Sequence, residues 1–304
     1  MKRVLVTGGR GFIGRHTLSA LCSRDFEVHV LDLKSEADIS DNIVWHNCNL
    51  SHQDEVEKIM HMVKPTHLLH LAWYTAPELY WKSIENVEWV KNSISLLRCF
   101  ADCGGLRYVI AGSCAEYDWS YGLLSETNTP MNPGTLYGIC KDGLHRLAKG
   151  FAQETGLSYA WGRVFFLYGP NENENRLVSY VVKSLLEEKV ARCSSGAQIR
   201  DYLFVQDVAD AFAELIDSSA QGAFNIGSGE GVHIKDIILK LGVALNRSDL
   251  IKMGALQTST NEPHIILADI SKIRKEVCWK PKVSLDDGLA QTIQWCKERY
   301  KIKV

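Results

Sequence analysis

The sequence predicts an α/β protein with a doubly wound parallel sheet and a smaller, mixed α/β domain at the C-terminal end. Two observations indicate this fold. Short apolar segments alternate with longer segments of helical period through the first half of the chain, and a glycine-rich turn follows the first apolar segment. Such alternation is typical of parallel strands whose crossover helices cover both faces of the sheet.

Six runs of apolar and β-branched residues are the expected strands of this sheet. They cover residues 4–6, 28–31, 43–45, 68–71, 108–111 and 158–166. Before the last of them, apolar side chains recur at three- and four-residue spacing and predict a helix. We expect its buried face to consist of Leu136, Cys140, Leu144, Leu147 and Phe151.

Composition and charge disfavour several classes of function. The 304 residues are 46% hydrophobic and 23% charged, so we expect a folded core rather than disorder. A net charge of −2 favours neither nucleic acid nor an anionic membrane as partner. Nine cysteines without a C-x-x-C pair indicate reduced thiols and no metal site. Without a secretory leader or a long apolar run, we expect a cytoplasmic protein that binds a small molecule.

The turn after the first strand carries the first functional signal. Gly8, Gly11 and Gly14 are spaced by three residues, with Phe12 and Ile13 between the last two. Glycines permit a tight turn, and they let backbone N–H groups and the N-terminus of the next helix approach a pyrophosphate. This turn therefore predicts a dinucleotide site of the Rossmann type.

Asp32 ends the second expected strand, where a carboxylate bonds the ribose of an adenosine. The same carboxylate repels the additional phosphate of NADP, so NAD is the expected cofactor. Lys34 lies two residues further along and offsets part of this repulsion, which leaves NADP as the alternative cofactor.

We expect residues 1–168 to form the dinucleotide-binding domain and residues 169–304 to form mainly a substrate-binding domain. A polar loop at residues 171–175 separates the two and precedes shorter elements mixed with turns. The apolar segment near residues 223–226 predicts another strand, which is able to return to the first sheet.

Tyr137 and Lys141 lie one helical turn apart at the start of the expected helix and therefore share a face. A free tyrosine has a pKa of about 10, and a cation within ~4–6 Å stabilises the phenolate and lowers that pKa. Ser113 follows the strand at 108–111, at the edge where doubly wound sheets bind ligands. We expect Tyr137 to act as acid or base while Ser113 bonds the substrate oxygen.

With these motifs the chain resembles the extended short-chain dehydrogenases/reductases of the NAD-dependent epimerase/dehydratase group. The resemblance extends over essentially the whole chain, and further motifs occur in the family's order. They are His70-Leu71-Ala72, Asn92, Arg163, Tyr168-Gly169-Pro170, Arg200-Asp201-Tyr202, Val205 to Ala209, Asn225-Ile226-Gly227 and Trp279-Lys280-Pro281.

The resemblance implies a nicotinamide-dependent enzyme that acts on nucleotide sugars, commonly as a homodimer formed through helices of the first domain. It implies Ser113, Tyr137 and Lys141 as the catalytic residues. Arg200, with Arg176 as a second candidate, would bind the substrate diphosphate, since a guanidinium holds phosphate oxygens bidentately. The implied cofactor contacts are Gly8, Gly11, Phe12, Ile13, Gly14, Asp32, Asn49, Leu50, Leu71, Ala72, Asn92, Tyr137 and Lys141.

Two departures from the family pattern bear on the reaction. The sugar-nucleotide 4,6-dehydratases of the group carry Asp-Glu directly after the strand-end hydroxyl residue, whereas Cys114 and Ala115 follow here, which disfavours dehydration. Glu116 and Asp118 are the nearest acids. An arginine that helps to bind the diphosphate in the family is missing from the segment 261–264.

Three functions remain open. The leading expectation is reduction of a nucleoside-diphosphate 4-keto-6-deoxy sugar by NAD(P)H, with Tyr137 protonating the oxygen. The alternative is a nucleotide-sugar 4-epimerase that keeps NAD bound and returns the hydride to the other face of the sugar. The third is a non-catalytic NAD-binding regulator, against which the intact Ser113, Tyr137 and Lys141 argue.

Overall fold

A seven-stranded parallel sheet organises the first part of the computed structural model, which describes residues 2–34, 42–77, 79–257 and 262–300. Its strands are β1 (Lys2–Thr7), β2 (Phe26–Asp32), β3 (Ile43–Asn47), β4 (His67–His70), β5 (Arg107–Ser113), β7 (Ser158–Val164) and β11 (Gly222–Ile226). Their spatial order is β11-β7-β5-β4-β1-β2-β3. The order reverses at β1, so the crevice beyond the carboxyl ends of β1 and β4 is the expected ligand site.

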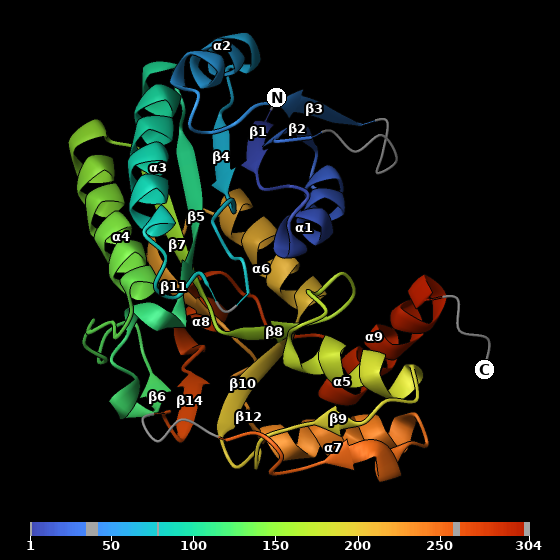
Figure 1. Ribbon diagram of the computed structural model, residues 1–304. Coiled ribbons are helices and arrows are strands. Elements are labelled where there is room, and N and C mark those ends of the chain that lie inside the picture. Colours follow the sequence, from blue (N-terminus) through green and yellow to red (C-terminus); the bar gives the residue numbers. More distant parts are fainter. Residues whose placement is uncertain (1, 35–41, 78, 258–261, 301–304) are drawn as a thin grey trace.

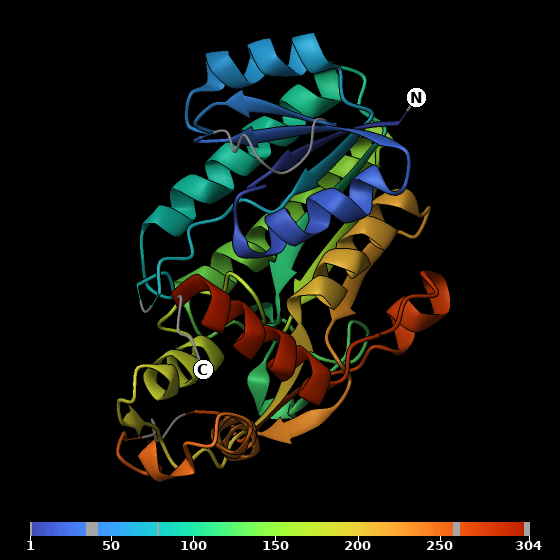
Figure 2. The ribbon, with the colours of Figure 1, turned by 90° about the vertical axis from the view of Figure 1, so that its right-hand side faces the viewer.

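Helices cover both faces of this sheet (Figures 1 and 2). One face carries α1 (Phe12–Cys22) and α6 (Val205–Asp217), and the other carries α2 (Gln53–Val63), α3 (Glu85–Asp102) and α4 (Leu136–Thr155). Leu18 and Phe212 belong to the core on the first face, while Phe100 and Leu144 belong to the core on the second. The doubly wound α/β fold expected from the sequence is confirmed.

The middle of each central strand is apolar because both of its faces are covered. Val4, Leu5 and Val6 of β1 have no exposed surface, although alternate side chains point to opposite faces of the sheet. Strand β4 ends at His70, so Leu71, which the sequence analysis placed in this strand, lies just beyond it at the carboxyl edge.

Of the five residues expected on the buried face of α4, Leu147 is the one that is exposed, while Leu136 and Phe151 are half-buried. Leu147 is 54% exposed, whereas Ala148 is fully buried. Over three turns, the 3.6-residue period moves the buried face toward Lys141, Leu144 and Ala148, so the prediction for Leu147 was wrong. The consequence is that Tyr137 and Lys141 both lie on the side of α4 that faces the sheet.

A smaller mixed sheet with its own helices covers the carboxyl end of the large one (Figure 1). Its strands are β6 (Leu123–Leu124), β8 (Phe166–Tyr168), β10 (Ile199–Phe204), β12 (Gly231–His233) and β14 (Ile265–Ala268). A separate pair joins β9 (Ala191–Arg192) to β13 (Ile251–Lys252). The remaining helices are α5 (Leu177–Leu186), α7 (Ile234–Ala244), α8 (Ser271–Glu276), α9 (Leu285–Tyr300) and the 3-10 turns η1 (Cys114–Glu116), η2 (Trp119–Tyr121) and η3 (Ser248–Leu250). Of the helices described, none has the length and apolar character needed to cross a membrane.

Asn225 connects the two sheets at the point where the chain returns to the large one. Strand β11 pairs with β7 at the edge of the seven-stranded sheet, and Asn225 lies in it with no exposed surface. Its amide nitrogen donates to the carbonyl oxygens of Leu124 (2.8 Å) and Asp269 (3.1 Å), and its amide oxygen accepts from the Tyr117 hydroxyl (2.7 Å). One side chain thus satisfies three buried polar groups.

Replacing Asn225 by Ala should lower the free energy of unfolding by about 3 kcal/mol, because it leaves buried donors and acceptors without partners. Urea denaturation followed by circular dichroism measures this loss. The control is Asn132→Ala, which removes an exposed amide and should cost less than about 0.5 kcal/mol. Equal stability losses in the two variants would contradict the connecting role of Asn225.

Candidate active site

A cleft of about 920 Å³ lies at the carboxyl edge of the large sheet, with the smaller sheet as its other wall. Most of the residues that the sequence singled out line it. The glycine turn is at one end, the side chains around Tyr137 are in the middle, and Arg176 and Arg200 are at the wall formed by the smaller sheet. A second cavity, of about 650 Å³, shares Trp119 with this cleft, and the residues that line it include none of the predicted site residues.

The glycine turn has the close contacts that its sequence predicts. Gly8 has a φ of +73°, and a Cβ atom there would lie 2.8 Å from the backbone of Ala72. A Cβ on Gly14 would lie 2.1 Å from the carbonyl oxygen of Gly8, so this position requires glycine if the helix is to pack on the turn. Because α1 begins at Phe12, its free N–H groups open onto the cleft, as a pyrophosphate needs.

The next part of the cleft suits an adenosine. Asp32, at the end of β2, accepts hydrogen bonds from the backbone N–H groups of Arg10 (3.0 Å) and Leu33 (2.8 Å), which fix its carboxylate at the cleft wall. Asn49 and Leu50 line the wall beside it. These residues fit the adenosine half of a dinucleotide.

Leu71 and Ala72 line the cleft where β1 and β4 end, as expected. Asn92 does not: it is half-buried on α3, and the structure does not bring it among the cleft-lining residues. Of the cofactor contacts that the resemblance implied, Asn92 is the one that the described part of the cleft lacks.

Ser113, Tyr137 and Lys141 come together in the middle of the cleft. Ser113 is the last residue of β5, and Tyr137 lies in the first turn of α4, whose N-cap Thr135 accepts a hydrogen bond from the N–H of Gly138 (3.1 Å). The Ser113 side chain lies near enough to the Tyr137 hydroxyl to lower its pKa by hydrogen bonding. Lys141 is 3% exposed, and its ammonium donates to the carbonyl oxygen of Ala111 (2.8 Å).

The electrostatics of this group differ from the sequence-based expectation. Burial raises the pKa of Tyr137, and the hydrogen bond with Ser113 offsets only part of that increase. The Lys141 ammonium lies 3.7 Å from the centre of the Trp73 ring rather than lowering the pKa of the phenol. Burial lowers the pKa of Lys141 to about 7, against the attraction of Glu116. The prediction of a lowered tyrosine pKa was wrong, because it neglected desolvation.

Aromatic rings surround Tyr137 on several sides. Tyr80 and Trp81 contact it edge to face, with ring centroids 4.9 and 5.6 Å away, and Trp73 does so at 6.4 Å. The orientation of Trp73 is fixed because its indole N–H donates to the buried side chain of Asn86 (2.9 Å). These rings line the cleft and also pack on one another, so they are suited both to a wall of a sugar pocket and to the core.

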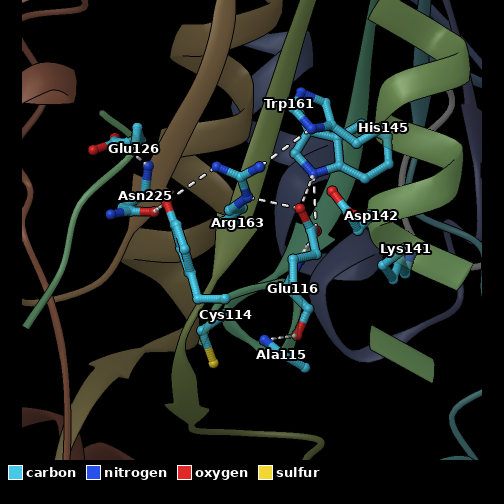
Figure 3. A network of polar contacts seen from close by, with 12 residues as sticks. Cys114, Ala115, Glu116, Glu126, Lys141, Asp142, His145, Trp161, Arg163 and Asn225 are labelled. Carbon is cyan, nitrogen blue, oxygen red and sulfur yellow. Dashed lines mark hydrogen bonds and ion pairs between the residues drawn. The ribbon is translucent and has the colours of Figure 1, made fainter. Parts of the chain in front are cut away.

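A buried ion pair behind Ser113 was not anticipated as part of the site (Figure 3). Glu116 has no exposed surface, and one of its oxygens accepts from the Arg163 guanidinium (2.6 Å). Its carboxylate also accepts from the backbone N–H of Ser113 (2.8 Å) and from the Trp161 indole (2.9 Å). Glu116, one of the two acids nearest to the strand-end serine, is therefore engaged in holding the end of β5, and it does not line the cleft.

The two arginines at the far wall have different surroundings. Arg176, the N-cap of α5, lies over the Tyr80 ring at 5.3 Å. Arg200 is buried and forms an ion pair with Glu262 at 2.9 Å. Both line the cleft together with Glu172, whose pKa burial raises to about 7. Glu172 and Glu262 were not anticipated, because neither lies in a recognisable motif.

The lowered pKa of Lys141 should give the ligand-free protein a specific pH dependence. Between pH 7 and 10.5 the unfolded chain holds this proton while the folded protein has lost it, so stability rises with pH in that window. Urea denaturation at pH 7 and pH 9 should show the wild type gaining stability relative to Lys141→Met. If the difference in unfolding free energy between the two proteins does not change with pH, the lowered pKa of Lys141 is contradicted.

Comparison with known proteins agrees with this geometry. Residues 4–227 match the NAD dependent epimerase/dehydratase family. UDP-glucuronate 4-epimerase of Thermodesulfobacterium geofontis is 25% identical over 322 residues, which cover 98% of this chain and 97% of that protein. UDP-glucuronic acid decarboxylase 1 of Arabidopsis thaliana is 25% identical over 312 residues, covering 98% and 70%.

A solved structure extends the likeness to the fold. The UDP-glucose 4-epimerase of Thermus thermophilus in complex with NAD superposes with a TM-score of 0.81 at 23% identity, over 97% of this chain and 99% of that one. The family match covers well over half of the sequence, and it includes the glycine turn, Ser113, Tyr137 and Lys141. The chain is a member of the NAD-dependent epimerase/dehydratase family, the enzymes that the sequence resembles.

Proposed function

We propose that this enzyme is an NAD-dependent 4-epimerase of a nucleoside-diphosphate sugar. The observation that carries the proposal is the grouping of Ser113, Tyr137 and Lys141 in the cleft that begins at the glycine turn and ends at two arginines. A dinucleotide at one end and a diphosphate at the other would place a sugar beside Tyr137. The similarity to a UDP-glucuronate 4-epimerase supports this choice over reduction.

The cofactor would be held by the glycine turn, Asp32 and the residues after β4. The backbone of Gly8 approaches Ala72 too closely for a side chain, so glycine is needed for this turn, and the N-terminus of α1 that follows it would bind the pyrophosphate. When bound, NAD supplies a reversible acceptor for the hydride at C4 of the sugar. Asp32 favours NAD over NADP because its carboxylate would repel a 2′-phosphate.

Tyr137 would take the proton of the sugar C4 hydroxyl as the C4–H bond breaks, and it would return that proton after the hydride is delivered to the opposite face. The cycle consumes neither a proton nor reduced cofactor. Ser113 would bond the same oxygen and hold it beside the phenol. Lys141 would favour the phenolate, provided that its ammonium stays charged in spite of burial.

Reduction of a keto sugar uses the same three residues, and Tyr137 would then act only as a proton donor. The reductase function remains a prediction from the sequence, and none of the relatives described above supports it. Dehydration is disfavoured further by the complete burial of Glu116. A regulator without catalysis would have no need for a serine, a tyrosine and a lysine grouped in the same cleft as the glycine turn.

We also propose a homodimer formed through α3 and α4. Val87 on α3 is 52% exposed, and Ile139 and Leu147 on α4 are 53% and 54% exposed. Apolar side chains on neighbouring helices are suited to a self-complementary contact between two copies.

Tyr137→Phe should reduce kcat by about 10²- to 10⁴-fold, the usual contribution of a general acid or base. The assay incubates the purified protein with catalytic NAD and a panel of UDP-, CDP-, dTDP- and GDP-sugars and separates 4-epimers by chromatography. Tyr121→Phe, an exposed tyrosine in the other cavity, should keep full activity.

Net oxidation of NADH or NADPH with 4-keto sugars, without any epimer, would replace the epimerase assignment by a reductase. Biological activity unchanged in Tyr137→Phe would instead indicate the regulator.

Asp32→Asn should shift the ratio of NADP to NAD affinity toward NADP by roughly tenfold or more, because the variant loses the repulsive charge. Fluorescence titration with each dinucleotide measures the two dissociation constants. Asp25→Asn, on an exposed turn where asparagine tolerates the positive φ, should leave the ratio unchanged. An unchanged ratio of NADP to NAD affinity in Asp32→Asn would contradict a ribose bound beside Asp32.

A further inference from the structure

Three of the five N–H groups of the Arg200 guanidinium already have partners in the protein itself. Its Nη1 donates to the carbonyl oxygens of Ile199 (2.9 Å) and His264 (3.3 Å), and its Nη2 donates to a carboxylate oxygen of Glu262 (2.9 Å). The side chain is only 3% exposed. The two carbonyls hold Nη1, and the bond to Glu262 takes one N–H group of Nη2, so an anion that approaches Nη2 competes with this carboxylate.

Glu262 is held in this position from its other side as well. The second carboxylate oxygen accepts from the Gln198 amide (3.1 Å), and Gln198 lines the same cleft. Glu262 is 36% exposed, so it is the member of the ion pair that solvent and ligands reach. A ligand that approaches Arg200 therefore encounters a neutral ion pair whose accessible member is negative.

Coulomb's law makes this arrangement unfavourable for a diphosphate. A carboxylate within a few ångströms of a phosphate repels it, and this repulsion is stronger in a partly desolvated cleft than in water. Arg176 is the other arginine at this wall, and Glu172 lies beside it in the lining. Among the described residues, this wall thus has one acid for each of the two arginines. The proposed substrate carries two negatively charged phosphates to the same wall.

We propose that Glu262 is an internal occupant of the Arg200 anion site, which the diphosphate of the substrate must displace, and that it thereby sets nucleotide affinity. This inference rests on the proposed function. Displacement transfers Arg200 from a carboxylate to a phosphate, so the net gain from the new contact is reduced by the contact that is lost. Competition from Glu262 weakens the binding of both substrate and product. An epimerase needs such weakening, because it must release a product that is an epimer of its substrate.

The test compares wild type and Glu262→Gln, both loaded with NAD, by calorimetric titration with UDP and with CDP. Glutamine keeps the size and the contact with Gln198 but removes the charge. We expect dissociation constants at least about tenfold lower in the variant for both nucleotides, with a larger difference at low ionic strength. In an Arg200→Met background the same substitution should tighten binding much less, because the released guanidinium is absent.

Glu214→Gln is the matched control. Glu214 also pairs with an arginine, Arg24, and is 39% exposed, but it lies away from the cleft. Nucleotide affinity should not change in this variant. Equal or weaker affinity in Glu262→Gln would overturn the proposal, and weaker affinity would identify Glu262 as a contact to the ligand.

The outcomes separate this inference from the proposed function. Epimerase activity together with unchanged nucleotide affinity in Glu262→Gln would reject only the role of Glu262. Absence of UDP and CDP binding in both proteins, with NAD still bound and no epimer formed from any sugar of the panel, would reject both.

Discussion

The buried ion pair between Glu116 and Arg163 is the contact on which the catalytic group depends. Two charges without exposed surface are costly to desolvate, and they are tolerated only when hydrogen bonds satisfy them. Here the Trp161 indole and the Ser113 N–H complete the carboxylate, while the Tyr117 hydroxyl and the His145 ring contact the guanidinium. The pair therefore joins β5 to β7 and fixes the last residue of β5, which is Ser113.

The same carboxylate acts on Lys141 through space. Glu116 opposes the loss of charge that burial imposes on the ammonium, and the Ala111 carbonyl and the Trp73 ring act in the same direction. A lysine whose pKa lies near 7 is sensitive to each of these contacts. The charge of Lys141 thus depends in part on Glu116, a residue that does not line the cleft.

Much of this protein follows from local patterns in its sequence. Strand positions, the glycine turn, Asp32 and the Tyr137-Lys141 spacing depend on residues that are close in the chain or on a period that a strand or helix imposes. The pKa of Tyr137 could not be predicted in that way, because desolvation depends on rings from other segments, such as Tyr80 and Trp81. Leu147 was misplaced because a spacing rule does not specify where the buried face lies after three turns.

Ion pairs between residues that are far apart in the chain also could not be predicted from the sequence. Glu116 and Arg163 are 47 positions apart, and Arg200 and Glu262 are 62 apart, so neither partner identifies the other. Their positions in the site explain why the two pairs have different consequences. The pair of Glu116 and Arg163 is closed to solvent, and its contacts are all within the protein. The pair of Arg200 and Glu262 has an accessible carboxylate at the cleft wall. A ligand can replace one member of an ion pair only if it can reach that pair. Glu262 is the accessible partner of Arg200, and for this reason Glu262, rather than Arg200 itself, governs how strongly that wall attracts a phosphate.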